Sequence, residues 1–190
     1  NRCNLVQATP TGWQSLVRAG WQNPYRAHLV CGGEVLSESL AASLLALTPC
    51  LWHVYGPTEA TIWSLVCKVK KAKTVLLGRP LDNTYCYALN DAGAFCMPGQ
   101  IGELYLGGMG VGRGYWKEGK IASKGRFVQD KKQASSRHAY RTGDLVRIAP
   151  DGDGMVFMGR VDREIKFRGY RINLDDIESC LIALAGVSLA

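Results

Sequence analysis

The sequence predicts an α/β fold in which a layered α/β part is followed by a small antiparallel β-rich part. Up to about residue 65, short apolar segments alternate with helix signals in the strand, helix, strand order that marks an α/β layer. From about residue 66 to about residue 161, short strand patterns alternate with turn signals, which is typical of a small antiparallel sheet or barrel.

The first part contains two clear helix starts. Thr9-Pro10 is an N-cap residue followed by proline at the first helical position, and Gly20 ends the same helix. Ser37 precedes a run of alanines and leucines and caps a second helix that reaches Leu47. We expect strands at residues 4–8, 28–31 and 50–54, the first of them buried, and helices at residues 10–20 and 38–47.

The second part is expected to hold strands joined by turns and then one helix. The segment Asp151-Gly-Asp-Gly154 is a hairpin signal between two apolar segments. A calcium loop is the alternative, but Met155 and Val156 stand where such a loop needs an oxygen ligand and a glycine. Strands are expected at residues 84–89, 102–106, 145–148 and 155–158, an exposed loop at 131–136, and a last helix at 174–185.

The composition is that of an ordinary globular protein. Of 190 residues, 47% are hydrophobic and 21% are charged, with a net charge of +7. The densest basic run, residues 68–73, has no interleaved aromatic residue, so we expect a solvated loop and no nucleic-acid partner. The seven cysteines have no zinc-type spacing and are expected to be buried, reduced thiols in a cytoplasmic protein. No apolar run approaches the length of a membrane span, so no membrane partner is expected.

Two segments carry groups that a nucleotide could use. Tyr55-Gly-Pro-Thr-Glu59 follows the third expected strand with an aromatic face for a base, a hydroxyl for phosphate and a carboxylate for Mg²⁺. By itself, this loop is better interpreted as a surface turn. The glycine-rich stretch from Gly102 to Gly108 is similar to a phosphate cradle, but it lacks the Lys-Ser/Thr ending of a P-loop, which favours a tight structural turn.

Five motifs in a fixed order change this interpretation. They are Tyr55-Gly-Pro-Thr-Glu59, Gly102-Glu-Leu-Tyr-Leu-Gly-Gly108, Arg113-Gly-Tyr-Trp116, Tyr140-Arg-Thr-Gly-Asp144-Leu, and Gly159-Arg-Val-Asp162 with Ile165-Lys-Phe-Arg-Gly-Tyr-Arg-Ile172. The series closely resembles the adenylation domains of non-ribosomal peptide synthetases, over essentially the whole chain. The resemblance implies the adenylate-forming enzyme fold. Residues 1–161 would then belong to the large N-terminal subdomain, and residues 162–190 would be the hinge and the start of a mobile α+β C-terminal subdomain.

The resemblance also implies roles at the nucleotide site. Tyr55 would stack on adenine, with Gly33 and Glu34 lining the base pocket and Phe157 closing it. Asp144 would accept both ribose hydroxyls. The implied cofactor-binding residues are Gly33, Glu34, Tyr55, Gly56, Asp144 and Phe157.

The implied catalytic residues are Thr58, which would bond the phosphates, Glu59, which would hold Mg²⁺, and Arg160, which would add positive charge. The implied cofactors are ATP, Mg²⁺ and phosphopantetheine on a partner carrier domain. Asp162 resembles the hinge between the two subdomains. Arg163, Lys166 and Arg171 flank it and are expected to meet the carrier domain or to be solvated, and Asn173 stands where many relatives carry glutamate.

The substrate pocket is implied in the same way. Its residues are Gln7, Val30, Gly32, Val54, Ile62 and Trp63. An indole with branched Val54 and Ile62 beside it leaves little volume beyond the substrate's α-carbon, so we expect glycine or at most alanine. The alternative is that Trp63 points into the core, as tryptophans often do.

The function implied is ATP-dependent activation of an amino acid as aminoacyl-AMP, followed by transfer to a carrier-protein phosphopantetheine thiol. The expected partners are a peptidyl carrier domain, a neighbouring condensation domain and an MbtH-like protein. In this family the phosphate loop would precede residue 1 and the catalytic lysine would follow Ala190, so the segment alone is expected to be inactive. The alternatives are an acyl- or aryl-CoA ligase and a non-catalytic remnant that serves as a scaffold.

Overall fold

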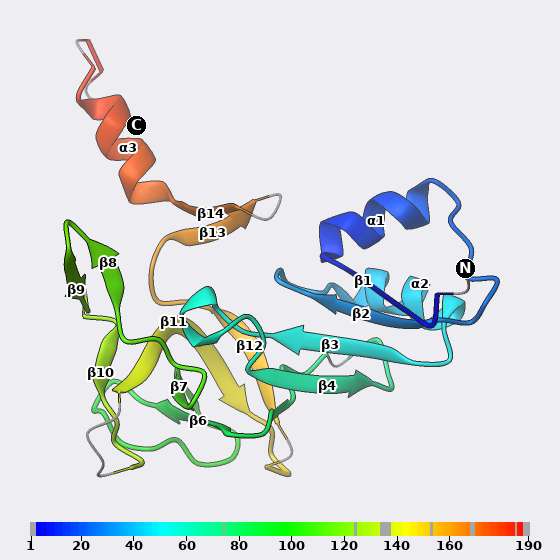
Figure 1. Cartoon of the computed structure of the whole chain (residues 1–190), viewed down its shortest axis with the longest axis horizontal. Helices are drawn as coiled ribbons and strands as arrows, with labels where there is room; N and C mark the ends of the chain where they lie inside the picture. Colours follow the sequence, from blue (N-terminus) through cyan, green and yellow to red (C-terminus); the bar gives the residue numbers. More distant parts are fainter. Residues whose placement is uncertain are drawn as a thin grey trace.

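The residues that the structure describes form two larger sheets, two separate two-stranded hairpins and three α-helices (Figure 1). The computed structural model describes residues 3–73, 75–123, 125–133, 138–152, 154–167, 170–184 and 186–187. The first sheet lies at the right of Figure 1 and the second at the lower left, while the last hairpin lies above the place where they meet and the last helix lies at the upper left. No helix in these ranges is long and apolar enough to cross a membrane.

The first sheet has the strand order β1-β2-β3-β4-β5 and is mixed. Strands β1 (Leu5–Ala8), β2 (His28–Gly32) and β3 (Leu51–Tyr55) are parallel, and β4 (Leu65–Val69) and β5 (Arg79–Pro80) continue the sheet antiparallel. Helices α1 (Pro10–Arg18) and α2 (Glu38–Leu47) cover one face. Their buried side chains form a core with those of the inner strands, including Trp13, Leu29, Leu44 and Leu51.

The helix starts are those that the sequence predicts. Thr9 Oγ1 accepts a hydrogen bond from the Gly12 amide at 3.2 Å, and Ser37 Oγ accepts one from the Leu40 amide at 3.3 Å. Each cap satisfies an amide that has no partner within its helix. Gly20, just past the end of α1, has φ +75°, a left-handed conformation that suits glycine.

The second sheet is antiparallel, as predicted. It has the order β10-β11-β7-β6. Strand β12 pairs with the C-terminal part of β11, beyond the part that pairs with β10. Its core includes Ala88, Leu104, Leu106 and Val146. Strands β11 and β12 pair antiparallel on either side of the expected hairpin turn, in which Asp153 lies outside the described residues. The strands are β6 (Thr84–Leu89), β7 (Ile101–Gly108), β10 (Phe127–Gln129), β11 (His138–Ile148) and β12 (Met155–Arg160), with the separate hairpin β8 (Tyr115–Lys117) and β9 (Lys120–Ala122).

Several expectations about the first sheet are wrong. The strand at 4–8 is not buried, because β1 is an edge strand and Leu5 is 54% exposed. The basic run 68–73 is not all loop, since Lys68 and Val69 end β4 and Val69 is in the core. Strands β4 and β5 also carry the first sheet to Pro80, beyond the expected limit near residue 65.

Other expectations fail in the second part and in the cysteines. The strand expected at 102–106 is confirmed as part of β7, so the interpretation of Gly102 to Gly108 as a tight turn is wrong. Glycine permits close packing in this strand. A Cβ on Gly102 would lie 2.5 Å from the Leu89 carbonyl oxygen. Cys3 and Cys180 are exposed, not buried. Residues 134–136 of the expected exposed loop lie outside the described residues.

The chain then continues into a hairpin over the junction of the sheets and a helix that extends away from it. These are β13 (Glu164–Phe167), β14 (Tyr170–Asn173) and α3 (Leu174–Ile182). Asn173 caps α3 by accepting a hydrogen bond from the Asp175 amide at 3.0 Å, which gives it a defined structural task. Helix α3 ends at Ile182, before the expected residue 185, which lies outside the described residues.

Candidate active site

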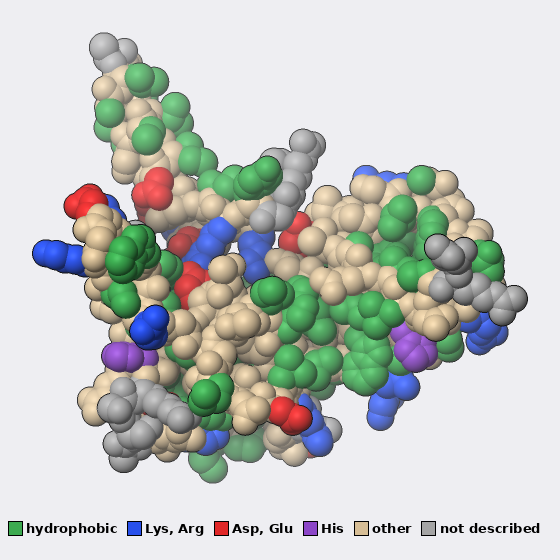
Figure 2. Space-filling model, in the orientation of Figure 1, with side chains coloured by type: hydrophobic (Ala, Val, Ile, Leu, Met, Phe, Trp, Pro, Cys, Tyr) green, Lys and Arg blue, Asp and Glu red, His purple; other side chains and the backbone are tan. Residues whose placement is uncertain are grey.

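A cleft of about 990 Å³ lies where the two sheets and the β13–β14 hairpin meet. Figure 2 shows charged side chains of both signs gathered in the hollow there. The cleft is lined by the loop after β3, by parts of β11 and β12, and by the hairpin. Of the residues singled out in the sequence, it brings together Gly33, Glu34, Val54, Tyr55, Gly56, Thr58, Ile62, Trp63, Asp144, Phe157, Arg160 and Asp162.

The loop after β3 is held in a strained, closed conformation. A Cβ on Gly56 would lie 2.4 Å from the Ile62 carbonyl oxygen, so only glycine fits at this crossing. Thr61 and Ile62 both have left-handed backbone angles, with φ of 60° and 63°. The Ser64 amide closes the loop on the Tyr55 carbonyl oxygen at 2.8 Å. Strained backbone conformations of non-glycine residues cluster at functional sites, where they hold side chains in fixed positions.

Tyr55 and Asp144 lie side by side in the cleft, although they come from different sheets. The Tyr55 hydroxyl donates to Asp144 Oδ2, and Arg160 Nη1 donates to Asp144 Oδ1. Burial, followed by the neighbouring Asp144 charge, raises the pKa of Tyr55 well above its usual range, so the hydroxyl stays protonated. A carboxylate has about four acceptor positions, so Asp144 can still accept two further O–H donors.

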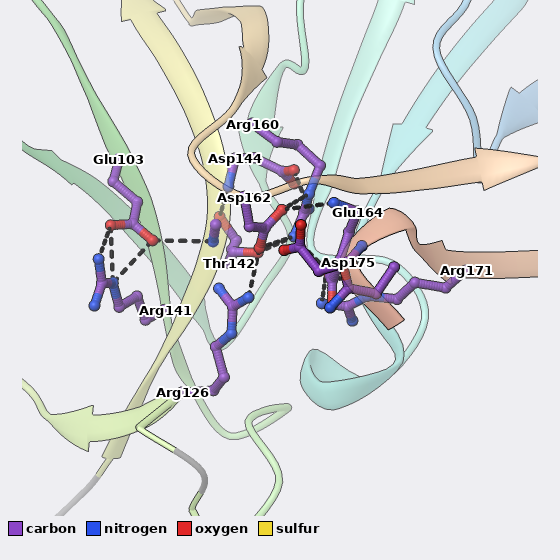
Figure 3. Close-up of polar contacts among 12 residues, drawn as sticks. Glu103, Arg126, Arg141, Thr142, Asp144, Arg160, Asp162, Glu164, Arg171 and Asp175 are labelled. Carbon is purple, nitrogen blue, oxygen red and sulfur yellow. Dashed lines mark hydrogen bonds and ion pairs between the residues drawn. The ribbon is translucent and has the colours of Figure 1, made fainter. Parts of the chain in front are cut away.

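Asp144 lies on a bulge of β11 that sequence reasoning did not predict. Pairing with β7 shifts register between Arg141 and Leu145, so the intervening residues leave the regular ladder. Glu103 of β7 supports this bulge, because its Oε1 accepts the Gly143 amide at 3.1 Å. Arg141 Nε holds the same carboxylate at 2.9 and 2.8 Å (Figure 3). Glu103 therefore positions the segment that presents Asp144.

Arg160 joins three carboxylates at the mouth of the cleft. Its guanidinium contacts Asp144, Asp162 at 2.6 Å and Glu164 at 2.6 Å (Figure 3). Arg126, which was not anticipated from the sequence, contacts Asp162 from the other side at 2.5 Å. Burial alone would raise the pKa of Asp162, but hydrogen bonds from Arg160 and Arg126 lower it to about 2. Since the folded-state pKa is depressed, this carboxylate stabilises the fold above its usual pKa, and that contribution is lost only as the pH falls towards 2.

Glu59 lies in the single-turn 3₁₀ helix η1 (Thr58–Ala60), with 10% of its side chain exposed. Its Oε1 accepts hydrogen bonds from the Tyr115 hydroxyl at 2.6 Å and from Arg171 Nη1 at 3.0 Å. Burial would raise the pKa of Glu59, but the Tyr115 hydrogen bond and the Arg171 charge contribute to a net lowering, so the carboxylate is ionised. Its Oε2 is buried and has no hydrogen-bond partner among the described residues.

This orphaned oxygen makes Glu59 suitable for Mg²⁺. Among the described residues no group of three or more His, Cys, Asp and Glu side chains could hold a metal ion. Mg²⁺ does not need such a cage, because it is commonly bound by one or two carboxylates together with substrate phosphates. A buried, ionised carboxylate with one free oxygen fits that mode of binding.

The residues expected in the substrate pocket lie only partly together. Gln7 pairs with Val30, and Gly32 pairs with Val54, so the side-chain positions of all four lie on the sheet face opposite α1 and α2. The Trp63 ring lies beside this face, with its Cζ3 3.1 Å from where a Cβ of Gly32 would be. The core interpretation of Trp63 is therefore wrong. The ring lines the cleft, whereas Gln7, Val30 and Gly32 do not.

Arg171 of β14 is exposed, as expected of a solvated residue. Its side chain also contacts Glu59 and binds Glu164 Oε2 at 2.5 Å. Arg163 is engaged with Asp175 and Glu178. Both arginines therefore hold parts of the chain together in this arrangement. Contact of this segment with a carrier domain stays a prediction.

The comparisons with known proteins agree with this geometry. Residues 1–116 match the family model described as AMP-binding enzyme. The chain belongs to the AMP-binding enzyme family, as a fragment of an adenylation domain of the kind found in nonribosomal peptide synthetases. It is 37% identical over 180 residues to the dimodular nonribosomal peptide synthase of Bacillus subtilis (strain 168), covering 94% of this chain and 8% of that protein.

Solved structures give the same result. A four-domain nonribosomal peptide synthetase bound to AMP and glycine is similar with a TM-score of 0.77 and 38% identity, over 98% of this chain and 14% of that one. A nonribosomal peptide synthetase protein containing adenylation and PCP domains is similar with a TM-score of 0.83 and 26% identity, over 97% of this chain and 39% of that one. The chain thus spans a small part of the proteins it matches.

Proposed function

We propose that the protein containing this chain uses ATP to activate an amino acid as aminoacyl-AMP and transfers it to the phosphopantetheine thiol of a peptidyl carrier domain. The observation that carries the proposal is the meeting of Tyr55, Asp144 and Arg160 in one cleft, with Glu59 beside it. An aromatic ring, a diol acceptor, a cation and a metal-binding carboxylate are the groups that binding of a nucleoside triphosphate requires.

Each residue would contribute a separate part of the reaction. The Tyr55 ring would stack on adenine with Phe157 on the other wall of the cleft, and Asp144 would accept the two ribose hydroxyls. Thr58 is exposed at the mouth of the cleft, where its hydroxyl could donate to phosphate. Mg²⁺ held by Glu59 would neutralise charge on the phosphates while the substrate carboxylate attacks the α-phosphate. Arg160 would place positive charge beside that centre.

Glycine is the substrate that the pocket residues favour. Gly32 and Val54 pair across β2 and β3, and the Trp63 ring lies against Gly32, so the sheet face offers little free space at this point. A similar four-domain synthetase is described as bound to AMP and glycine, which supports the hypothesis of a glycine substrate. A filled pocket rejects larger side chains by overpacking, at about 1–3 kcal/mol for each misfit.

The substrate assay tests this function. Pyrophosphate exchange by the complete adenylation domain, measured across the amino acids, should be fastest with glycine. Trp63→Ser should admit alanine or serine, because removing the indole opens the pocket beside Gly32. Trp116→Ser is the matched control, since Trp116 is 74% exposed and should leave the preference unchanged.

The possible outcomes distinguish the functions. A parent preference for leucine or phenylalanine would refute glycine but leave amino-acid activation standing. Exchange only with acyl or aryl acids would indicate a CoA ligase, and no exchange with any acid would indicate a scaffold.

Ribose recognition can be tested separately. Asp144→Ala should weaken ATP binding by more than it weakens amino-acid binding, because the ribose hydroxyls lose their acceptor. The parent domain should discriminate against 2′-deoxy-ATP, and this discrimination should fall by about tenfold or more in the variant, the equivalent of roughly 1–3 kcal/mol. Asp82→Ala, at an exposed position, is the control. Equal discrimination in variant and parent would show that another group binds the ribose.

The carrier domain is the best supported partner. A similar structure is described as containing adenylation and PCP domains, which is the arrangement that thiol transfer requires. A neighbouring condensation domain and an MbtH-like protein stay predictions.

A further inference from the structure

The Glu59 carboxylate is contacted from two distant parts of the chain. Tyr115 belongs to the β8–β9 hairpin, and Arg171 belongs to β14, 112 residues after Glu59. The Arg171 contact joins the loop after β3 to the segment that follows Asp162. It is therefore a direct tie between the two parts of the chain that the cleft separates.

Arg171 is well anchored for this contact. Its Nε and Nη2 bind Glu164 Oε2 at 2.8 and 2.5 Å, and its Nη1 binds Glu59 Oε1 at 3.0 Å. Arg171 is 34% exposed and Glu59 is 10% exposed, so water screens this ion pair less than it screens a surface pair. The guanidinium acts as a fixed counter-ion for the Glu59 carboxylate.

The same carboxylate has one oxygen left for a metal. Tyr115 and Arg171 both use Oε1, whereas Oε2 is buried without a hydrogen-bond partner among the described residues. A divalent cation at Oε2 would lie close to the Arg171 guanidinium. The cation and the guanidinium are both positive, so they repel each other at this distance. Both are attracted by the single negative charge of Glu59, and each therefore weakens the binding of the other.

We propose that Arg171 competes electrostatically with Mg²⁺ for Glu59. Binding of the metal weakens the tie between the β13–β14 hairpin and the loop after β3, and closure of this tie weakens metal binding, because the coupling is reciprocal. The inference rests on the proposed function, since it takes Glu59 as the metal-binding carboxylate. It assigns to Arg171 a task in regulating when the C-terminal segment is released.

The test uses the complete adenylation domain and Mn²⁺ as a probe for the divalent site. Mn²⁺ binding is followed by electron paramagnetic resonance without nucleotide, and Mg²⁺ affinity by competition. Arg171→Gln should tighten binding by roughly 5- to 20-fold, which lies in the lower part of the range typical of coupling between two sites. Arg163→Gln is the matched control, because it removes another ion pair of the same segment without touching Glu59. It should leave metal affinity unchanged.

Hydrogen exchange gives a second readout that does not depend on catalysis. In the parent domain, Mg²⁺ should speed amide exchange in residues 164–167 and 170–173, because the hairpin loses its tie to Glu59. In Arg171→Gln, exchange there should already be fast and should not respond to Mg²⁺. If Arg171→Gln fails to fold, Arg171→Lys takes its place, because lysine retains the charge but not the two-pronged contact with Glu164. Its metal affinity should then exceed that of the parent domain, and an affinity equal to or below that of the parent would refute the competition.

The outcomes separate this inference from the proposed function. Unchanged or weaker Mn²⁺ binding in Arg171→Gln, together with loss of binding in Glu59→Gln, would refute the competition and leave the metal site standing. Unchanged binding in Glu59→Gln would remove the metal site itself. Mg²⁺-independent exchange of the hairpin in the parent domain would also refute the competition.

Discussion

Glu59→Gln should lower the rate of adenylate formation by the complete domain by roughly two to three orders of magnitude, the usual loss for one preorganised electrostatic group. Glutamine retains the shape of the side chain and can still accept the Tyr115 hydrogen bond at the oxygen that Tyr115 now contacts. Glutamine lacks the negative charge that the carboxylate carries at the buried Oε2. The effect would therefore report on the charge that we propose holds the metal.

The measurement is pyrophosphate exchange as a function of Mg²⁺ concentration. Removal of a metal ligand should raise the Mg²⁺ concentration needed for half-maximal rate, and Glu118→Gln, at an 85% exposed side chain, should leave it unchanged. Near-normal rates in Glu59→Gln at saturating Mg²⁺ would show that the metal is held elsewhere. Because Arg171 also loses its Glu59 partner in this variant, thermal unfolding should be measured beside it.

Local signals in the sequence predicted local structure well. The two helix caps, Thr9 and Ser37, are formed by side chains that bond amides three residues ahead, so neighbouring residues suffice to predict them. The antiparallel pairing of β11 with β12 was likewise indicated by turn residues that lie between them in the sequence. The burial of β1 could not be predicted like this, because an edge strand differs from an inner strand only in its neighbours.

In the candidate site, too, local features could be predicted from the sequence and long-range contacts could not. Its individual groups, such as Tyr55 and Asp144, belong to motifs that are recognisable in the sequence. Their supporting contacts are not recognisable, because Glu103 reaches Gly143 across 40 positions and Arg171 reaches Glu59 across 112. Pairing of strands β7 and β11 and the bulge at Asp144 create the first of these contacts, and the position of the C-terminal hairpin creates the second.

Asp162→Pro should spare one half-reaction of the complete domain and slow the other by about a hundredfold, the loss expected when reacting groups are misplaced by about 1 Å. We propose Asp162 as the hinge at which the C-terminal segment swings between adenylate formation and thiol transfer. A hinge must change its backbone angles, whereas proline fixes φ near about −65° and restricts the residue before it. The domain would then be held in one of its two arrangements. Separate assays of adenylate formation and thioester formation would show which one.

Loss of the carboxylate must be separated from loss of rotation. In the structure, Asp162 is held by Arg126 and Arg160, so any substitution removes both ion pairs and leaves Arg126 without this partner. Asp162→Ala removes the same contacts but leaves the backbone free to rotate, and it should lower both half-reactions by a similar, smaller factor. The difference between the two variants isolates the hinge motion. If proline and alanine reduced both half-reactions equally, Asp162 would be a structural anchor for the two arginines, and the turning point of the chain would lie at another residue.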